Sequence, residues 1–220
     1  MNKIIGVNYL NFPQDHREIL RPAMYSKMPK FQSNGSYTYA WIYKNAHQSL
    51  RTFFYSLNFS IEYQHYNYIP PNENIIVVLR DPLERWVSGL VQYLSGRVPN
   101  VRLDDDIMKI CIDHTVMDLH TELQVKFLYG LKLDKCIFFY MDSNLNHNLS
   151  KFFNTMNSIP FINIGNNDPL KTELYNFINL YLNNNPTDKS NLIKSLSLDY
   201  KLIDDIKTTT GFTNYVNHSA

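Results

Sequence analysis

The hydrophobic positions of this 220-residue chain fall into short apolar runs that alternate with segments of helical spacing. Residues 36–44 and 73–81 predict strands, and the second run is apolar enough for a strand buried on both faces of a parallel sheet. Helical spacing follows each run, over residues 49–57 and 83–94. The order strand, loop, helix therefore occurs twice.

The rest of the chain continues this alternation. Residues 135–141 predict another buried strand and residues 143–156 a helix, while residues 104–131 contain two helical stretches. From Asp168 the pattern predicts helices separated by a loop over residues 183–190. Alternating strands and helices predict an α/β fold with a mainly parallel central sheet flanked by helices.

Length and composition predict one globular domain over residues 1–220, since a chain of this size can enclose one substantial core. Residues 1–35 mix Pro, Asn, Gln and Ser without periodicity and predict an irregular N-terminal leader. The first apolar run is too short for a signal peptide, and no apolar stretch is long enough to span a bilayer. We therefore expect a soluble, cytoplasmic protein with no membrane partner.

Charge and cysteine usage exclude two further classes of function. A formal net charge of +1 does not provide the strongly basic face of a protein that binds duplex nucleic acid, so no nucleic-acid partner is expected. Cys111 and Cys136 lie far apart and have no metal-ligand spacing with a neighbouring His, so no metal is expected. The sequence leaves the oligomeric state open.

The first of the two strand-to-helix turns is KNAHQSLR, from Lys44 to Arg51. Ligands of open α/β sheets bind beyond the carboxyl ends of the strands, where a helix N-terminus presents N–H groups and partial positive charge to an anion. Lys44 adds a full charge and Ser49 a hydroxyl. The turn is not a Walker A loop, because no Gly lies between Ser36 and Lys44. Alternatively, it is an ordinary exposed turn with Ser49 starting a helix.

The second turn, LRDPLERWVS, follows the most apolar strand. Arg80 lies at the strand end, and a helix that begins at Pro82 would bring Ser88 back toward it, so that both side chains bind one phosphate. The alternative is structural: Asp81 caps the helix and Arg85 forms a surface ion pair.

Taken together, these turns resemble the two nucleotide-binding segments of sulfotransferases that use 3′-phosphoadenosine 5′-phosphosulfate (PAPS). The first resembles the 5′-phosphosulfate loop, Pro-Lys-x-Gly/Ala-x-Thr-Ser-Leu-Arg, with departures at Tyr43 and Gln48. The second resembles the 3′-phosphate segment, hydrophobic-Arg-Asp/Asn-Pro-x-x-Arg-x-x-Ser, without a departure. The chain is more similar to the carbohydrate-modifying and bacterial or viral members than to the phenol and steroid enzymes.

The resemblance implies a P-loop-NTPase-like three-layer fold and transfer of a sulfuryl group from PAPS to a hydroxyl or amine, with a carbohydrate as the favoured acceptor. The other product would be adenosine 3′,5′-bisphosphate. Carried over residue by residue, the donor-binding set is Lys44, Asn45, Ala46, His47, Gln48, Ser49, Leu50, Arg80 and Ser88. Lys44 would also be catalytic, because it stabilises the bridging oxygen as the bond to sulfur breaks.

Three residues are candidates for the general base. The family often places a catalytic His where His65 lies, and a pKa of about 6.5 suits an imidazole for this role. Glu62 is the second candidate and His47 the third. His120 and Gln124, one helical turn apart, either line the acceptor pocket or form a capping pair.

Two other functions stay open at this point. A P-loop-type kinase would need Ser or Thr directly after the lysine, where this chain has Asn45. A non-catalytic sulfotransferase-like protein would bind its ligand without transfer, in keeping with the departures at Tyr43 and Gln48.

Overall fold

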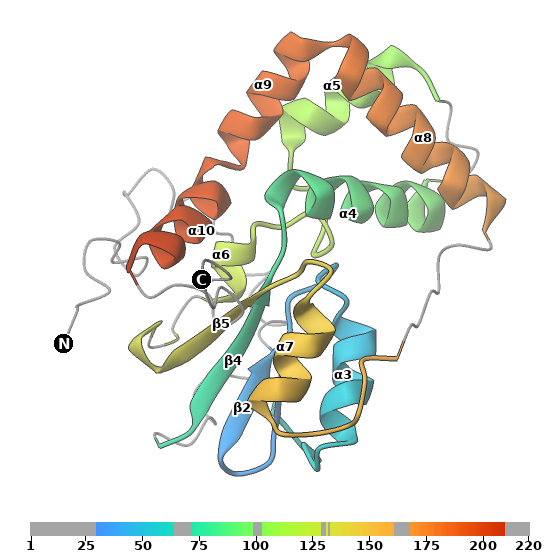
Figure 1. Ribbon diagram of the computed structural model, residues 1–220. Helices are drawn as coiled ribbons and strands as arrows, with labels where there is room; N and C mark the ends of the chain where they lie inside the picture. Colours follow the sequence, from blue (N-terminus) through green and yellow to red (C-terminus); the bar gives the residue numbers. More distant parts are fainter. Residues whose placement is uncertain are drawn as a thin grey trace. The chain divides into compact units, whose positions relative to one another are not determined.

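The computed structural model describes residues 30–63, 72–98, 103–128, 131, 133–160 and 168–209 (Figure 1). These residues form an α/β structure with five strands and eight α-helices. The strands are β1 (Phe31–Ser33), β2 (Tyr37–Ala40), β3 (Ile61–Tyr63), β4 (Asn74–Leu79) and β5 (Cys136–Tyr140). The helices are α3 (His47–Tyr55), α4 (Pro82–Arg97), α5 (Asp105–His114), α6 (Gln124–Phe127), α7 (Leu145–Phe152), α8 (Pro169–Asn184), α9 (Pro186–Ser195) and α10 (Ser197–Thr209), with a 3-10 turn, η2, at Leu133–Lys135.

The sheet is mixed, with the strand order β3-β1-β2-β4-β5. β4 pairs in parallel with both β2 and β5, whereas β1 pairs antiparallel with both β2 and β3. The expectation of a mainly parallel sheet is therefore wrong. Its parallel part consists of the three apolar runs that the sequence singled out.

The antiparallel part includes one strand, β1, from residues that were expected to be irregular. Phe31–Ser33, within the predicted leader, forms β1 and returns as β2 through a turn at Asn34–Ser36. Gly35 has a φ of 86° in this turn, and Asn34 Oδ1 accepts hydrogen bonds from the N–H groups of Ser36 and Tyr37 at 3.0 Å each. A three-residue strand is too short for alternation to reveal it.

Most of the predicted helices are confirmed near their expected positions, and one predicted loop is wrong. The loop expected over residues 183–190 is reduced to Asn185, since α8 ends at Asn184 and α9 begins at Pro186. Proline fits the first turn of a helix, where its missing N–H has no intrahelical partner to lose. Pro186 therefore starts a helix here instead of marking a longer break.

The chain divides into two compact units. The described residues within Met1–Arg80, Gln124–Phe161 and Lys201–Ala220 form the first unit, which contains the sheet. In this unit α3 and α7 lie side by side on one face of the sheet (Figure 1). Their buried side chains pack on those of the strands in one core: Tyr39, Trp41, Leu50, Phe53, Phe54, Phe59, Ile76, Val78, Phe139, Leu145 and Leu149.

The second unit, within Asp81–Leu123 and Ile162–Tyr200, is helical in its described residues. α8 packs along α4, and α9 packs against α5 and α8. The Trp86 side chain is fully buried, and its indole N–H donates to the Thr115 carbonyl at 2.7 Å. The single domain expected from the length of the chain stays a prediction.

None of the helices in the ranges given above is long and apolar enough to cross a membrane. The cytoplasmic location stays a prediction.

Candidate anion-binding site

Lys44 and Arg80, one from each of the two turns singled out in the sequence, lie at one edge of the sheet in the first unit. β2 and β4 are adjacent and parallel, with Ala40 opposite Val77, so their carboxyl ends lie at the same edge. Lys44 follows β2 and Arg80 follows β4 directly. The Arg80 guanidinium donates a hydrogen bond from Nη1 to the Lys44 carbonyl at 3.2 Å. The structure thus brings together the two cationic residues on which the sequence interpretation rests.

The Lys44 loop has an unusual backbone conformation. Lys44 has a φ of 68° and Ala46 a φ of 53°, both in the left-handed region that few residues other than glycine adopt. Each such residue costs about 1–2 kcal/mol of backbone strain. Backbone strain of this kind is concentrated in active sites and ligand-binding loops, so the conformation favours a binding role for the Lys44 loop.

Helix α3 begins directly after this loop with an apolar residue at its N-cap. Ala46 holds that position, and its methyl group cannot accept a hydrogen bond from the N–H groups of the first turn. The first turn contains no acidic residue. An anion placed at this end would therefore meet the positive end of the helix dipole and the Lys44 loop without competition from a capping carboxylate.

Asn45 supports the loop from inside the protein. Its side chain is fully buried, and Nδ2 donates to the Val78 carbonyl at 2.8 Å and to Gln124 Oε1 at 2.7 Å. Any contact of Asn45 with a ligand would have to come from its backbone, because its side-chain amide is committed to the core.

Gln124 also lies behind the loop, contrary to both sequence interpretations of this residue. Its side chain is fully buried, so it does not line an open acceptor pocket. Its amide pairs with the backbone of Arg80 instead: Oε1 accepts from the Arg80 N–H and Nε2 donates to the Arg80 carbonyl, both at 2.9 Å.

The other loop residues differ in their exposure. Gln48 is exposed and His47 half-buried, with the His47 ring 4.9 Å from that of Tyr43. Ser49 is 9% exposed, whereas Leu50 is fully buried in the core and its N–H donates to the Ala46 carbonyl. Leu50 therefore holds α3 on the sheet and leaves ligand contacts to the preceding residues.

Glu62, the second candidate for the base, takes part in an ionic cluster on β3. Its carboxylate accepts hydrogen bonds from Arg51 Nη2 at 2.7 Å and from the Tyr55 hydroxyl. The Tyr55 hydrogen bond, followed by Arg51, outweighs burial and lowers the pKa of Glu62. Such a carboxylate is a weak base at neutral pH. His65, the first candidate, lies outside the described residues.

The junction between β4 and α4 is capped from within the chain. Asp81 is the N-cap of α4 and accepts from the Glu84 N–H at 2.9 Å, as the structural alternative predicted. The surface ion pair predicted for Arg85 is wrong, because this side chain is 1% exposed and donates to the Glu122 carbonyl. Ser88 lies on α4 in the second unit, and its convergence with Arg80 on one phosphate stays a prediction.

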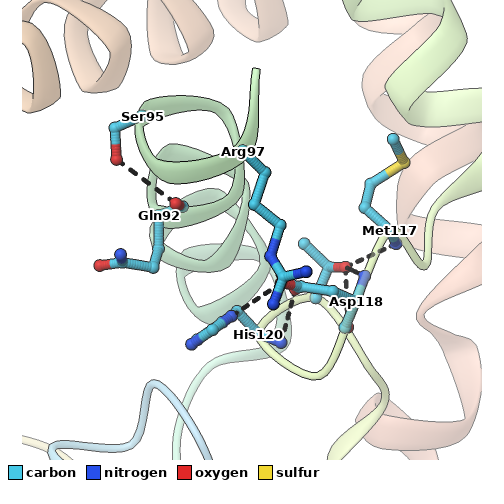
Figure 2. Close-up of polar contacts among 7 residues, drawn as sticks. Gln92, Ser95, Arg97, Met117, Asp118 and His120 are labelled. Atoms are coloured by element: carbon cyan, nitrogen blue, oxygen red, sulfur yellow. Dashed lines mark hydrogen bonds and ion pairs between the residues drawn. The ribbon is translucent and has the colours of Figure 1, made fainter. Parts of the chain in front are cut away.

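In the second unit His120 pairs with Asp118, a contact that the sequence interpretation missed (Figure 2). Asp118 Oδ2 lies 2.9 Å from His120 Nδ1 and 3.7 Å from Arg97 Nε, and Asp118 Oδ1 accepts from the His120 N–H at 2.8 Å. Burial alone would raise the pKa of Asp118, but the hydrogen bonds from His120 and the Arg97 charge lower it. The available signal was the spacing Asp-x-His, which is typical of an Asx turn.

The turn that carries this pair packs against Gly89 of α4. A Cβ at position 89 would lie 2.6 Å from the carbonyl carbon of His120 and closer still to its oxygen. Thr121 Oγ1 closes the turn by accepting from the Met117 N–H at 2.7 Å and the Asp118 N–H at 3.1 Å. Only glycine lets the helix and the turn approach this closely.

Within the described ranges, no group of three or more His, Cys, Asp or Glu residues could hold a metal ion. The expectation that no metal takes part stays a prediction.

No protein-family model, no curated protein and no solved structure matches this chain. The function must be inferred from the site itself.

Proposed function

We propose that this protein is a sulfotransferase that moves the sulfuryl group of PAPS to a hydroxyl or amine, with a carbohydrate as the favoured acceptor. The observation that carries the proposal is the contact between Arg80 Nη1 and the Lys44 carbonyl, 3.2 Å apart, at the carboxyl ends of two parallel strands. A nucleotide with anionic groups at both its 5′ and 3′ positions suits a site with cations from two adjacent loops. The proposal includes a P-loop-like, three-layer arrangement for the whole chain.

Each part of the site has a role in this proposal. Lys44 and the N-terminus of α3 bind the 5′-phosphosulfate, where the uncapped helix end offers N–H donors. Arg80 binds the 3′-phosphate through its planar fork of donors. His47 and Gln48 lie on the accessible part of the same loop. The residues present therefore fit the donor.

In the reaction the acceptor oxygen or nitrogen attacks sulfur, and the bond from sulfur to the bridging oxygen breaks. The electron pair of that bond remains on the departing adenosine 3′,5′-bisphosphate, whose new negative charge Lys44 stabilises. The acceptor proton passes to a general base. Because hydrogen bonds already hold Glu62 as an anion of lowered pKa, we favour His65 for this role.

Asn45 argues against the P-loop kinase alternative. In a Walker A loop the residue after the lysine is a Ser or Thr whose hydroxyl binds magnesium. Here the Asn45 side chain is fully buried and donates to Val78 and Gln124. A magnesium ligand is therefore missing from that position, whatever binds in front of the loop.

The test is calorimetry with adenosine 3′,5′-bisphosphate and, separately, with ATP and magnesium. We expect micromolar binding of the bisphosphate and little response to ATP. Lys44→Ala and Arg80→Ala should each lose about 1.5–3 kcal/mol of binding free energy, roughly ten- to a hundredfold in affinity. Lys151→Ala, at an exposed position of α7, and Arg97→Ala, at the end of α4, are the matched controls and should bind normally.

Other outcomes would redirect the proposal. Binding of ATP with magnesium alone would favour a kinase, and unchanged affinity in Arg80→Ala would remove the 3′-phosphate assignment. If the bisphosphate binds but labelled PAPS transfers nothing to a broad panel of acceptors, the protein is a non-catalytic binding module.

A further inference from the structure

A closed ring of hydrogen bonds joins the two loops of the proposed donor site. Asn45 donates to Gln124 Oε1 at 2.7 Å, and the Gln124 amide pairs with the Arg80 backbone. The Arg80 side chain then returns to the Lys44 carbonyl, which belongs to the residue before Asn45. Both loops are therefore attached to one buried amide.

The Gln124 amide continues the hydrogen-bonding pattern of the sheet past the end of β4. The last residue pair of β4 and β5 is Leu79 with Tyr140, and Arg80 is the next residue along. Gln124 supplies this residue with one acceptor and one donor, both at 2.9 Å, as a neighbouring strand would. The Gln124 side chain thus holds the backbone of Arg80 one residue beyond the sheet.

We propose that Gln124 is the positioning residue of the donor site, which sets the separation between the Lys44 loop and Arg80. This inference rests on the proposed function and goes beyond the roles assigned there. Gln124 is fully buried, so water cannot replace a lost hydrogen bond. Its task requires a donor and an acceptor on one planar group, which the amide of Gln combines without charge.

If Gln124 positions the two loops, its loss should weaken some ligands more than others, whereas a general loss of stability should not discriminate between ligands. A ligand that spans both loops, such as adenosine 3′,5′-bisphosphate, depends on their separation, whereas adenosine 5′-phosphate occupies one loop only. Gln124→Met keeps the volume of the side chain and removes both polar functions. We expect this variant to bind the bisphosphate about tenfold more weakly and to bind the monophosphate within about twofold of wild type.

Gln32→Met is the matched control. Gln32 is also a fully buried glutamine of the first unit, and its amide donates to the carbonyls of Phe59 at 2.7 Å and Arg51 at 3.3 Å. It does not touch Lys44 or Arg80 through these contacts. The control should lose stability as Gln124→Met does, but keep the wild-type ratio of the two affinities.

Hydrogen exchange of the Arg80 amide provides a readout that needs no ligand. The Arg80 N–H donates to Gln124 Oε1, so its exchange should become faster in Gln124→Met and remain slow in Gln32→Met. If Gln124→Met does not fold, Gln124→Asn is the second variant. It retains an amide that is one methylene too short to reach both loops, and should show the same loss of preference for the bisphosphate.

The possible outcomes distinguish a failure of the positioning role from a failure of the proposed function. A wild-type protein that prefers the bisphosphate, with Gln124 variants that lose both ligands equally or neither, would overturn the positioning role alone. Unchanged exchange of the Arg80 amide would do the same. A wild-type protein with no preference for the bisphosphate would overturn the donor site, and the positioning role with it.

Discussion

The strand-to-helix junctions that follow β2 and β4 differ in how each helix begins. After β2, two residues in left-handed conformations, Lys44 and Ala46, lead into α3, whose N-cap has no polar side chain. After β4, Asp81 caps α4 with its own carboxylate and Pro82 occupies the first turn. One junction carries backbone strain, and the other is stabilised by local interactions.

The difference indicates which helix end could receive an anion. At α4 the Asp81 carboxylate already accepts from the Glu84 N–H and lies at the positive end of the helix dipole, whereas the N-cap of α3 provides no carboxylate. The β4 junction contributes through Arg80, which precedes the cap and reaches the Lys44 carbonyl. A strained, uncapped junction beside a capped one therefore argues for ligand binding at the first.

The largest effect is expected from Gly89→Ala on α4, the helix of the capped junction. This variant tests whether the helix must pack closely against the His120 turn. The added Cβ would meet the backbone of His120, which cannot move aside as a flexible side chain would. We expect a loss of about 3 kcal/mol or more in the free energy of unfolding, measured by denaturant titration.

Gly96→Ala on the same helix is its control. Its Cβ would meet only Gln92 Nε2 at 3.8 Å, an ordinary contact, so this variant should be as stable as wild type or about 0.5–1 kcal/mol more stable. Equal effects at both positions would show that the close approach at Gly89 is not required.

The next effect tests the uncapped end of α3 directly. Ala46→Asp places a carboxylate where the proposed 5′-phosphosulfate binds, and like-charge repulsion should weaken calorimetric binding of adenosine 3′,5′-bisphosphate about tenfold. Ala46→Gly is the control: it relieves the strain of a φ of 53°, should stabilise the protein by about 1 kcal/mol, and should keep its affinity. Undiminished binding by Ala46→Asp would place the anion elsewhere.

A smaller effect is expected at the cap of α4. Asp81→Ala removes the acceptor of the Glu84 N–H and should lower the free energy of unfolding by about 1 kcal/mol. Asp81→Asn should restore most of this loss, because an amide oxygen also caps. Asp113→Ala, at an exposed position of α5, is the control. If Asp81→Ala were as stable as wild type, the Asp81 cap would not stabilise the β4 junction, and the contrast with the β2 junction would fail.

The smallest effect is confined to acid and concerns the turn packed against α4. The folded-state pKa of Asp118 is lowered, so the ionised carboxylate contributes stability above its unfolded pKa of about 3.9. This contribution is lost as the pH falls through the lower, folded-state pKa. The stability advantage of wild type over Asp118→Asn should therefore shrink between about pH 5 and pH 3, as measured by denaturant titration. A constant difference over that range would contradict the pairing of Asp118 with His120.

Long apolar runs allowed the main elements to be predicted from the sequence. The runs around β2, β4 and β5, and the helices that follow them, were located because periodicity is a local property of the chain. The same reasoning missed β1, a strand of three residues whose partners β2 and β3 stabilise it. It also placed Arg85 at the surface, whereas this side chain is buried and donates to the Glu122 carbonyl inside the second unit.

In the candidate site, too, local patterns identified some residues and missed the role of another. Lys44 and Arg80 were proposed from residue type and position after a strand, whereas Gln124 was expected either to line an acceptor pocket or to form a capping pair with His120. Its actual partner is the backbone of Arg80, 44 positions earlier in the chain. No local pattern encodes a hydrogen bond between segments so far apart.

The sequence alone indicated the α/β class, the strands that precede Lys44 and Arg80 and, as one of two interpretations, the cap at Asp81, because periodicity and capping depend on residues a few positions apart. The tertiary structure decided the mixed sheet, the burial of Arg85 and the ring through Asn45 and Gln124. Each of these depends on pairing between distant segments. Most buried polar groups find a partner, and which partner each one finds is fixed only when the chain has folded.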